Sequence, residues 1–136
     1  INESEELYKH KLEGLKDIHG DVHVRHRLDV HGRHIYTAHH QGNKIASAKL
    51  SGQDHYVTDV DVNPEFRRKG VASRLYDFIE KHSGKKLKPS PMYQTGEGKA
   101  FWKNRKCNDV NKLTTKIAII FNHLQPIVLF LLLKYF

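Results

Sequence analysis

Hydrophobic and polar residues alternate along the first half of the chain in the two-residue period of β-strands. Short stretches rich in Gly, Asn, Ser and Gln separate the alternating segments and predict tight turns. The four predicted strands cover residues 21–30, 33–39, 44–50 and 56–62. Because each turn is short, consecutive strands should pair with one another as an antiparallel meander.

Apolar residues recur at helical spacing elsewhere in the chain. This spacing predicts an amphipathic helix from Glu3 to Ile18, a second helix from Val71 to His82 that Gly84 ends, and a short third helix over residues 99–105. Between the last two helices, the proline-bounded segment 85–91 is expected to hold a short parallel strand. Helices and strands thus mix in one α/β chain.

A basic loop joins the fourth predicted strand to the helix that begins at Val71. Pro64 ends the strand because it lacks a backbone N–H, and Gly70 allows a tight turn. The amides of residues 69–72 can then point at one anion, and the positive end of the helix dipole adds to the charges of Arg67, Arg68 and Lys69. This arrangement predicts a phosphate-binding loop.

The stretch from Val62 to Ala72 resembles the acetyl-CoA signature of the GNAT superfamily of N-acetyltransferases. In that signature a strand ending in V-x-P leads to Arg or Gln, two residues, Gly, one residue, and Gly or Ala. Arg67, Gly70 and Ala72 occupy these positions here. The alternative is an ordinary strand-to-helix turn with a solvated basic loop.

The resemblance implies an α/β fold of GNAT type, with a mixed, mostly antiparallel sheet, flanking helices and an atypical carboxyl end. The signature strand would splay from a parallel neighbour, and acetyl-CoA would lie in the gap. Backbone amides near the end of that strand would bind the acetyl group and the pantetheine arm, and amides of the loop would bind the pyrophosphate. The implied cofactor-binding residues are Val60, Val62, Arg67, Arg68, Lys69, Gly70, Val71, Ala72 and Ser73.

The implied reaction moves an acetyl group from acetyl-CoA to a primary amine by direct attack, and it needs a base. Asp59 and Asp61 are the main candidates because they lie on the opposite strand face from Val60 and Val62. His55 and Tyr56 are weaker candidates. The alternative is that both aspartates are solvent-facing strand residues paired with nearby cations.

Many members of the family use a Tyr in their last helix as the general acid, and this chain has Trp102 at the aligned position. Trp102 has no proton to give a thiolate as a phenol does, and with Phe101 it is expected in the core. Tyr93 is the remaining candidate acid, and otherwise water must serve. The missing Tyr leaves open a non-catalytic module that only binds acyl-CoA.

The net charge of +8 is concentrated in the predicted cofactor-binding half. Residues 65–106 hold twelve Lys and Arg against four Asp and Glu, a surplus equal to the whole net charge. A basic surface suits the phosphates of coenzyme A, and it also keeps a nucleic-acid-binding protein as an alternative. Exposed aromatic residues interleaved with the cations are lacking, which disfavours nucleic acid as the partner.

Cysteine content and histidine spacing limit other chemistry. The single cysteine, Cys107, excludes an intramolecular disulfide, and with no recognisable signal peptide it favours a reducing, cytoplasmic setting. His23 and His26 lie three apart on a strand, which puts their rings on opposite faces, so no metal site is expected. The expected partners are a small-molecule or peptide amine and a second copy of the chain in a homodimer.

The composition changes after Cys107, so residues 1–106 are interpreted as the acetyl-CoA-binding domain and residues 107–136 as an apolar tail. Asn122, His123, Gln125 and Pro126 interrupt the apolar run in its middle. Three interpretations stay open for the tail: substitute core strands split at Pro126, a membrane-associated segment, and a non-native extension.

Overall fold

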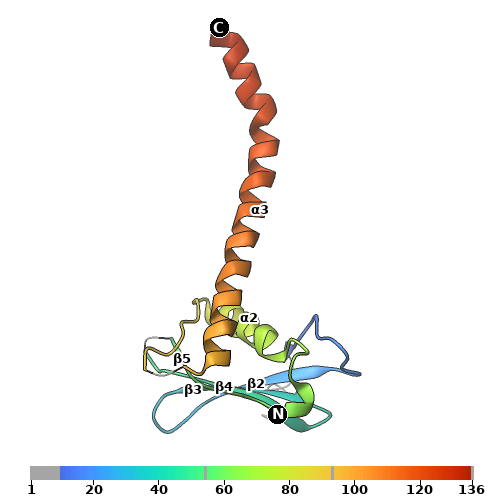
Figure 1. Cartoon of the computed structure of the whole chain (residues 1–136), viewed down its shortest axis with the longest axis vertical. Helices are drawn as coiled ribbons and strands as arrows, with labels where there is room; N and C mark the ends of the chain where they lie inside the picture. Colours follow the sequence, from blue (N-terminus) through green and yellow to red (C-terminus); the bar gives the residue numbers. More distant parts are fainter. Residues whose placement is uncertain (1–9, 54, 93, 136) are drawn as a thin grey trace, which may run out of the picture. The chain divides into compact units, whose positions relative to one another are not determined.

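The computed structural model describes residues 10–53, 55–92 and 94–135. Its elements form two compact units, one over Ile1–Tyr93 and the other over Gln94–Phe136. The first unit holds the sheet and one helix, and the second is a single long helix (Figure 1). The elements in chain order are β1 (His10–Lys11), β2 (Val22–Leu28), β3 (His34–His40), β4 (Asn43–Leu50), β5 (Val57–Val62), the 3-10 turn η1 (Pro64–Phe66), α2 (Val71–Ser83) and α3 (Gly96–Tyr135).

The sheet has five strands in the order β1-β2-β3-β4-β5, and every neighbouring pair is antiparallel. The antiparallel meander predicted from the alternation and turns is therefore confirmed, with each predicted strand within a few residues of the observed one. The register is irregular between Ala38 and His39 and again between Lys49 and Leu50. The second irregularity is a bulge that places Leu50 opposite Val57 and Lys49 opposite Asp59.

Helix α2 lies across one face of the sheet (Figure 1) and closes the core of the first unit. Its buried side chains are four residues or fewer apart, as an amphipathic helix requires, and they meet alternate residues of the central strands. The largest fully buried side chains of this core are Tyr36, Tyr76, Leu50, Leu75, Ile79, Val22, Val24 and Val71. Burying these apolar surfaces drives folding and fixes both ends of α2 against the sheet.

Gly70 and Gly84 bound α2 at its two ends. Both have left-handed backbone conformations, with φ of 84° and 71°. The N–H of Gly84 donates to the carbonyl of Glu80 and ends the helix, as predicted. The helix predicted over residues 71–82 is therefore confirmed.

The helix predicted from Glu3 to Ile18 is wrong for the part that the structure describes, residues 10–18. His10 and Lys11 form strand β1 against β2, and the N–H of Leu12 donates to the carbonyl of Val22 at 2.8 Å. Left-handed conformations at Gly14 and Asp17 then rule out a continuous helix. Leu12 is buried, so the apolar residue at this position serves the sheet edge. Residues 3–9 of the predicted helix lie outside the described residues.

Helix α3 is longer than the sequence pattern predicted. The short helix predicted over residues 99–105 is part of one helix of 40 residues, which contains Pro126. Residues 117–135 are helical, so they form no substitute core strands. The predicted domain boundary after residue 106 falls inside α3, whereas the contacts divide the chain between residues 93 and 94.

Candidate functional site

The free edge of β5 is the first part of the candidate site. β5 is the last strand of the sheet, and among the described residues it pairs with another strand, β4, on one side only. The N–H of Asn63 donates to the carbonyl of Ile45 in β4, at 2.8 Å. Because successive residues of a strand direct their backbone groups to opposite sides, those of Val62 and Val60 point away from β4, toward the free edge.

A parallel neighbour touches only the start of this edge. Tyr56 and Lys88 form an isolated parallel bridge, in which the N–H of Val57 donates to the carbonyl of Lys88 at 2.9 Å. The N–H of Lys88 in turn donates to the carbonyl of His55, at 3.3 Å. Within the described ranges no such pairing continues along β5, so the two segments part after the bridge. The parallel strand predicted within residues 85–91 is reduced to this one contact.

The loop after β5 is held by its own hydrogen bonds. The Asn63 side chain accepts from the N–H of Glu65, and Asn63 O accepts from the N–H of Phe66 at 2.9 Å. Arg67 Nε donates to the carbonyl of Val62 at 3.0 Å, which ties the loop back to the strand end. These hydrogen bonds connect the turn to itself and to the end of β5.

Two residues of this loop have left-handed backbone conformations. Arg68 and Gly70 have φ of 61° and 84°, in a backbone region that residues other than glycine and asparagine rarely adopt. A Cβ built on Gly70 would meet no heavy atom within 4 Å, so the space in front of this backbone is open. A phosphate could approach the chain here.

The amino end of α2 faces this space with donors and positive charge. The first N–H groups of a helix have no intrahelical acceptor, and Val71 and Ala72 stand at these positions. The dipole of a 13-residue helix adds a partial positive charge. Lys69 lies over the ring of Phe66, 5.7 Å from its centre, and its carbonyl accepts from the N–H of Lys16 at 3.1 Å. An open strand edge next to a cationic helix end suits a long ligand with phosphates at one end.

This geometry agrees with a comparison of the sequence with known families. The model of the acetyltransferase (GNAT) family matches residues 3–88. The chain belongs to the GNAT family. Its members typically use acetyl-CoA, and the membership indicates an acyltransferase. Comparisons with curated proteins and with solved structures gave no significant match.

The two candidate bases of this GNAT chain lie on the sheet face opposite α2. Asp59 pairs with Lys49 and Asp61 with Ser47, and both aspartates are exposed. The bulge puts Val57, which is buried, on the other face with Val60, an arrangement that simple alternation does not give. The carboxylates are therefore separated from the core but lie within the strand whose edge is free.

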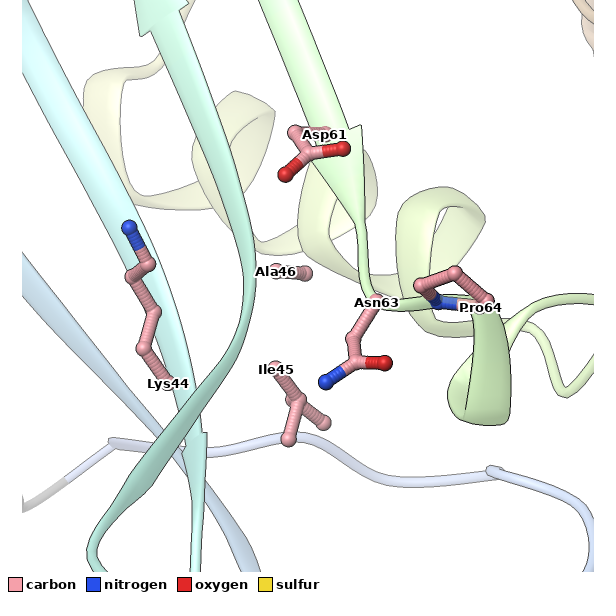
Figure 2. Close-up of a pocket in the computed structure, with 6 residues that line it drawn as sticks. All are labelled: Lys44, Ile45, Ala46, Asp61, Asn63 and Pro64. Atoms are coloured by element: carbon pink, nitrogen blue, oxygen red, sulfur yellow. The ribbon is translucent and has the colours of Figure 1, made fainter.

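A small hollow adjoins one of these carboxylates. Its volume is about 260 Å³, and Figure 2 shows Lys44, Ile45 and Ala46 of β4 on one side with Asp61, Asn63 and Pro64 on the other. Ligand pockets usually exceed about 300 Å³, so this hollow holds a small group at most. Asp61 lines it, and Asp59 is outside its lining.

The remaining candidates for proton transfer are His55, Tyr56 and Tyr93. His55 Nε2 lies 3.0 Å from Ser83 Oγ, so its ring contacts the end of α2. The backbone N–H of Tyr56 donates to Ser51 Oγ. Tyr93 lies outside the described residues. Trp102 is half-buried against Phe101 in the second unit, with ring centres 6.1 Å apart.

A cluster of histidines near one end of α2 was not predicted. His26 Nε2 lies 2.8 Å from His34 Nδ1, and the His26 ring stacks on Tyr36 at 4.5 Å between ring centres. Tyr36 Oη lies 3.0 Å from Nδ1 of His82, and the His10 ring packs on Phe78. The sequence signal was available, because His26, His34 and Tyr36 occupy positions of one parity in neighbouring strands.

The arrangement of the histidines can be compared with that of a metal site. Among the described residues, no group of three or more His, Cys, Asp or Glu is arranged to hold a metal ion. His23 and His26 lie on opposite faces of β2, because Val24, the partner of Ala38, and His26, the partner of Tyr36, share the core face. The opposite-face placement expected from strand geometry is confirmed.

Proposed function

We propose that this GNAT chain transfers an acetyl group from acetyl-CoA to a primary amine. The observation that carries the proposal is that the free edge of β5 lies next to the open, cationic start of α2. Backbone groups of Val60 and Val62 would bind the acetyl and pantetheine part by hydrogen bonds. The amides at the start of α2, with Arg68 and Lys69, would bind the pyrophosphate.

The protein's chemical task is then to place two reactants and move one proton. A primary amine has a pKa of about 10 and is protonated at neutral pH, so it must lose a proton before it can attack the thioester carbon. Asp59 or Asp61 would accept that proton, directly or through water. As the carbon–sulfur bond breaks, the thiolate of coenzyme A takes up a proton from water or from Tyr93.

The first test is calorimetric titration with acetyl-CoA and with free coenzyme A, on the parent chain and on two matched variants. Gly70→Glu fills and charges the proposed phosphate position. Gly84→Glu makes the same change at the other end of α2, where φ is also left-handed and a built Cβ also meets no atom within 4 Å. Each substitution should cost about 1–2 kcal/mol of stability, because a side chain at positive φ is strained.

Only Gly70→Glu should lose affinity for the coenzyme, by about a hundredfold, as expected when one or two charge-assisted hydrogen bonds of about 1.5–3 kcal/mol each are removed. Equal affinities of the two variants would refute the phosphate site. Thermal unfolding of both variants checks that they fold to a similar extent.

A non-catalytic acyl-CoA-binding module is the second candidate, because Trp102 stands where many relatives carry a Tyr acid. That function predicts coenzyme binding that Gly70→Glu loses, with no thiol release over a broad panel of amines. Thiol release with any amine, dependent on Gly70, favours the transferase.

A further inference from the structure

The second half of α3 is a strongly apolar helix with no covering element within its unit. Of the described residues, α3 forms the one helix that is long and apolar enough to cross a membrane, judged by length and composition. Its large apolar side chains are exposed along the whole segment; for example, Ile117 at its start is 57% exposed and Leu133 at its end is 74% exposed. A soluble helix with such a surface would need a partner to bury it.

The dimensions of this segment match a lipid bilayer. Residues 117–133 make a helix of about 25 Å at 1.5 Å per residue, close to the hydrocarbon thickness of about 30 Å. In the stretch 127–133 every residue is apolar, so all sides of the helix are apolar there. An in-plane amphipathic helix would instead keep one continuous charged face.

Charged and aromatic residues mark both ends of the apolar segment. Lys116 precedes it, and Lys134 and Tyr135 follow it. Long cationic side chains and tyrosines are typical of the boundary between hydrocarbon and water. The segment between these ends contains no Lys, Arg, Asp or Glu.

The preceding turns of α3 carry a positive surplus that fits one face of a membrane. Residues 96–116 hold six Lys and Arg against two Asp and Glu. Such basic segments next to a spanning helix remain on the cytoplasmic side and attract anionic lipids. This charge pattern favours a lipid surface, and not a groove on a protein, as the partner of α3.

Asn122, His123 and Gln125 are the polar residues inside the segment. Their positions along the helix place all three within one half of its circumference, which leaves the other half apolar throughout. Polar side chains in spanning helices can hydrogen-bond to a neighbouring helix or to backbone carbonyls. They weaken insertion without preventing it.

We propose that residues 117–133 span a lipid bilayer and that the basic turns before them contact an anionic leaflet. This inference is independent of the proposed acetyl transfer. It assigns a membrane surface as the partner of α3 and puts the basic turns on the side of the anionic leaflet.

The first experiment is flotation of the full chain after cell-free synthesis with preformed vesicles. Vesicles of phosphatidylcholine containing phosphatidylserine should carry the chain upward and retain it after washes in high salt and alkaline carbonate. Leu124→Lys puts a charge at the middle of the segment and should reduce the floated fraction at least tenfold. Leu113→Lys makes the same change on α3 before the segment and should leave flotation unchanged.

Three results would overturn the proposal: no flotation of the parent chain, release by salt alone, or equal flotation of Leu124→Lys and the parent. Aggregated protein sediments in this gradient, so it is not mistaken for inserted protein.

A second experiment separates spanning from lying in the surface. Cys107 is exposed and is the chain's one cysteine, so a membrane-impermeant maleimide should label it in intact vesicles. In the Cys107→Ser background, a Tyr135→Cys variant should be labelled only after detergent is added. Labelling of Tyr135→Cys in intact vesicles would show that the helix does not cross.

Discussion

At the scale of single residues, His26, His39 and His55 each have a pKa below the ordinary value of histidine. Burial lowers the pKa of His26, and the neighbouring charges of His34 and His82 lower it further. Burial is also the main cause that lowers the pKa of His39 and of His55. The 2.8 Å contact between His26 Nε2 and His34 Nδ1 needs one donor and one acceptor, which two fully protonated rings would not supply.

Stability should therefore fall as the pH falls. In the unfolded chain a histidine takes up its proton near pH 6.5, whereas the folded chain resists protonation at these rings. The unfolded state then binds more protons, so the stability present above about pH 7 is lost progressively as the pH drops below about 6.5. The carboxyl of Asp29, whose pKa is lowered to about 2 chiefly by the backbone N–H of Arg33, stays ionised through this window and does not contribute.

The pH effect can be assigned with a pair of variants. His26→Phe keeps the ring stack on Tyr36 and removes one titrating group, so the midpoint of thermal unfolding should change less between pH 7.5 and pH 5 than in the parent. His31→Phe alters an exposed turn residue, so its unfolding midpoint should change with pH as much as that of the parent. An unchanged slope in His26→Phe would contradict the role given to this ring.

Asp59 and Asp61 can be compared by single amide substitutions. Asn cannot accept the amine proton, so replacing the base should lower kcat by about 10²- to 10⁴-fold with an active acceptor amine. We expect the larger loss for Asp59→Asn, and Asp61→Asn serves as its matched control. Binding of acetyl-CoA should be unchanged in both, because the proposed coenzyme contacts are backbone groups and the loop. Full activity in both variants would leave water as the base.

At the scale of elements, α2 joins the candidate site to the core. Leu75 is fully buried at the middle of this helix. Leu75→Ala should cost about 2–5 kcal/mol of unfolding free energy, because it leaves a cavity between the helix and the sheet. Leu113→Ala, at a residue that is 59% exposed, should change stability by less than about 0.5 kcal/mol. Urea denaturation followed by circular dichroism measures both, and equal losses would place Leu75 outside the core.

The elements with strong local patterns were predictable from the sequence. Alternation and turn residues located β2 to β5, and Gly84 with the spacing of Val71, Leu75 and Ile79 located α2. The bulge near Lys49 was not predictable. Thr58 is the extra residue because of how β5 pairs with β4, and a threonine at this position does not by itself indicate a bulge. The start of the chain was misread as helix, since Leu12 and Leu15 fit a helical period although Leu12 pairs with a strand.

The candidate site was predictable to a similar degree. The loop from Val62 to Ala72 could be located because the conformations at its ends depend on local residue types. Contacts between distant segments, such as that of His26 with His82, depend on packing and could not be read from spacing. The assignments of Val60, Val62 and residues 67–73 to coenzyme binding stay predictions, and so do those of Asp59, Asp61 and Tyr93 to catalysis.

At the scale of the whole molecule, charge and apolar surface are unevenly distributed along the chain. The surplus of cations begins at the loop after β5 and continues into the first turns of α3, and the apolar segment follows directly. The loop is proposed to bind the phosphates of a coenzyme, and the first turns of α3 are proposed to contact the headgroups of lipids. Both associations should weaken as salt rises, because long-range attraction between exposed charges is screened.

The free edge of β5 also affects how copies of the molecule behave toward one another. An unpaired strand edge is a template for another strand, and proteins usually guard such edges with charge or a covering segment. Asp59 and Asp61 give this edge strand two like charges, so two copies approaching edge to edge would repel each other. A bound pantetheine arm would cover the same backbone groups. Saturation with the coenzyme should then act as a guard against self-association during purification and storage.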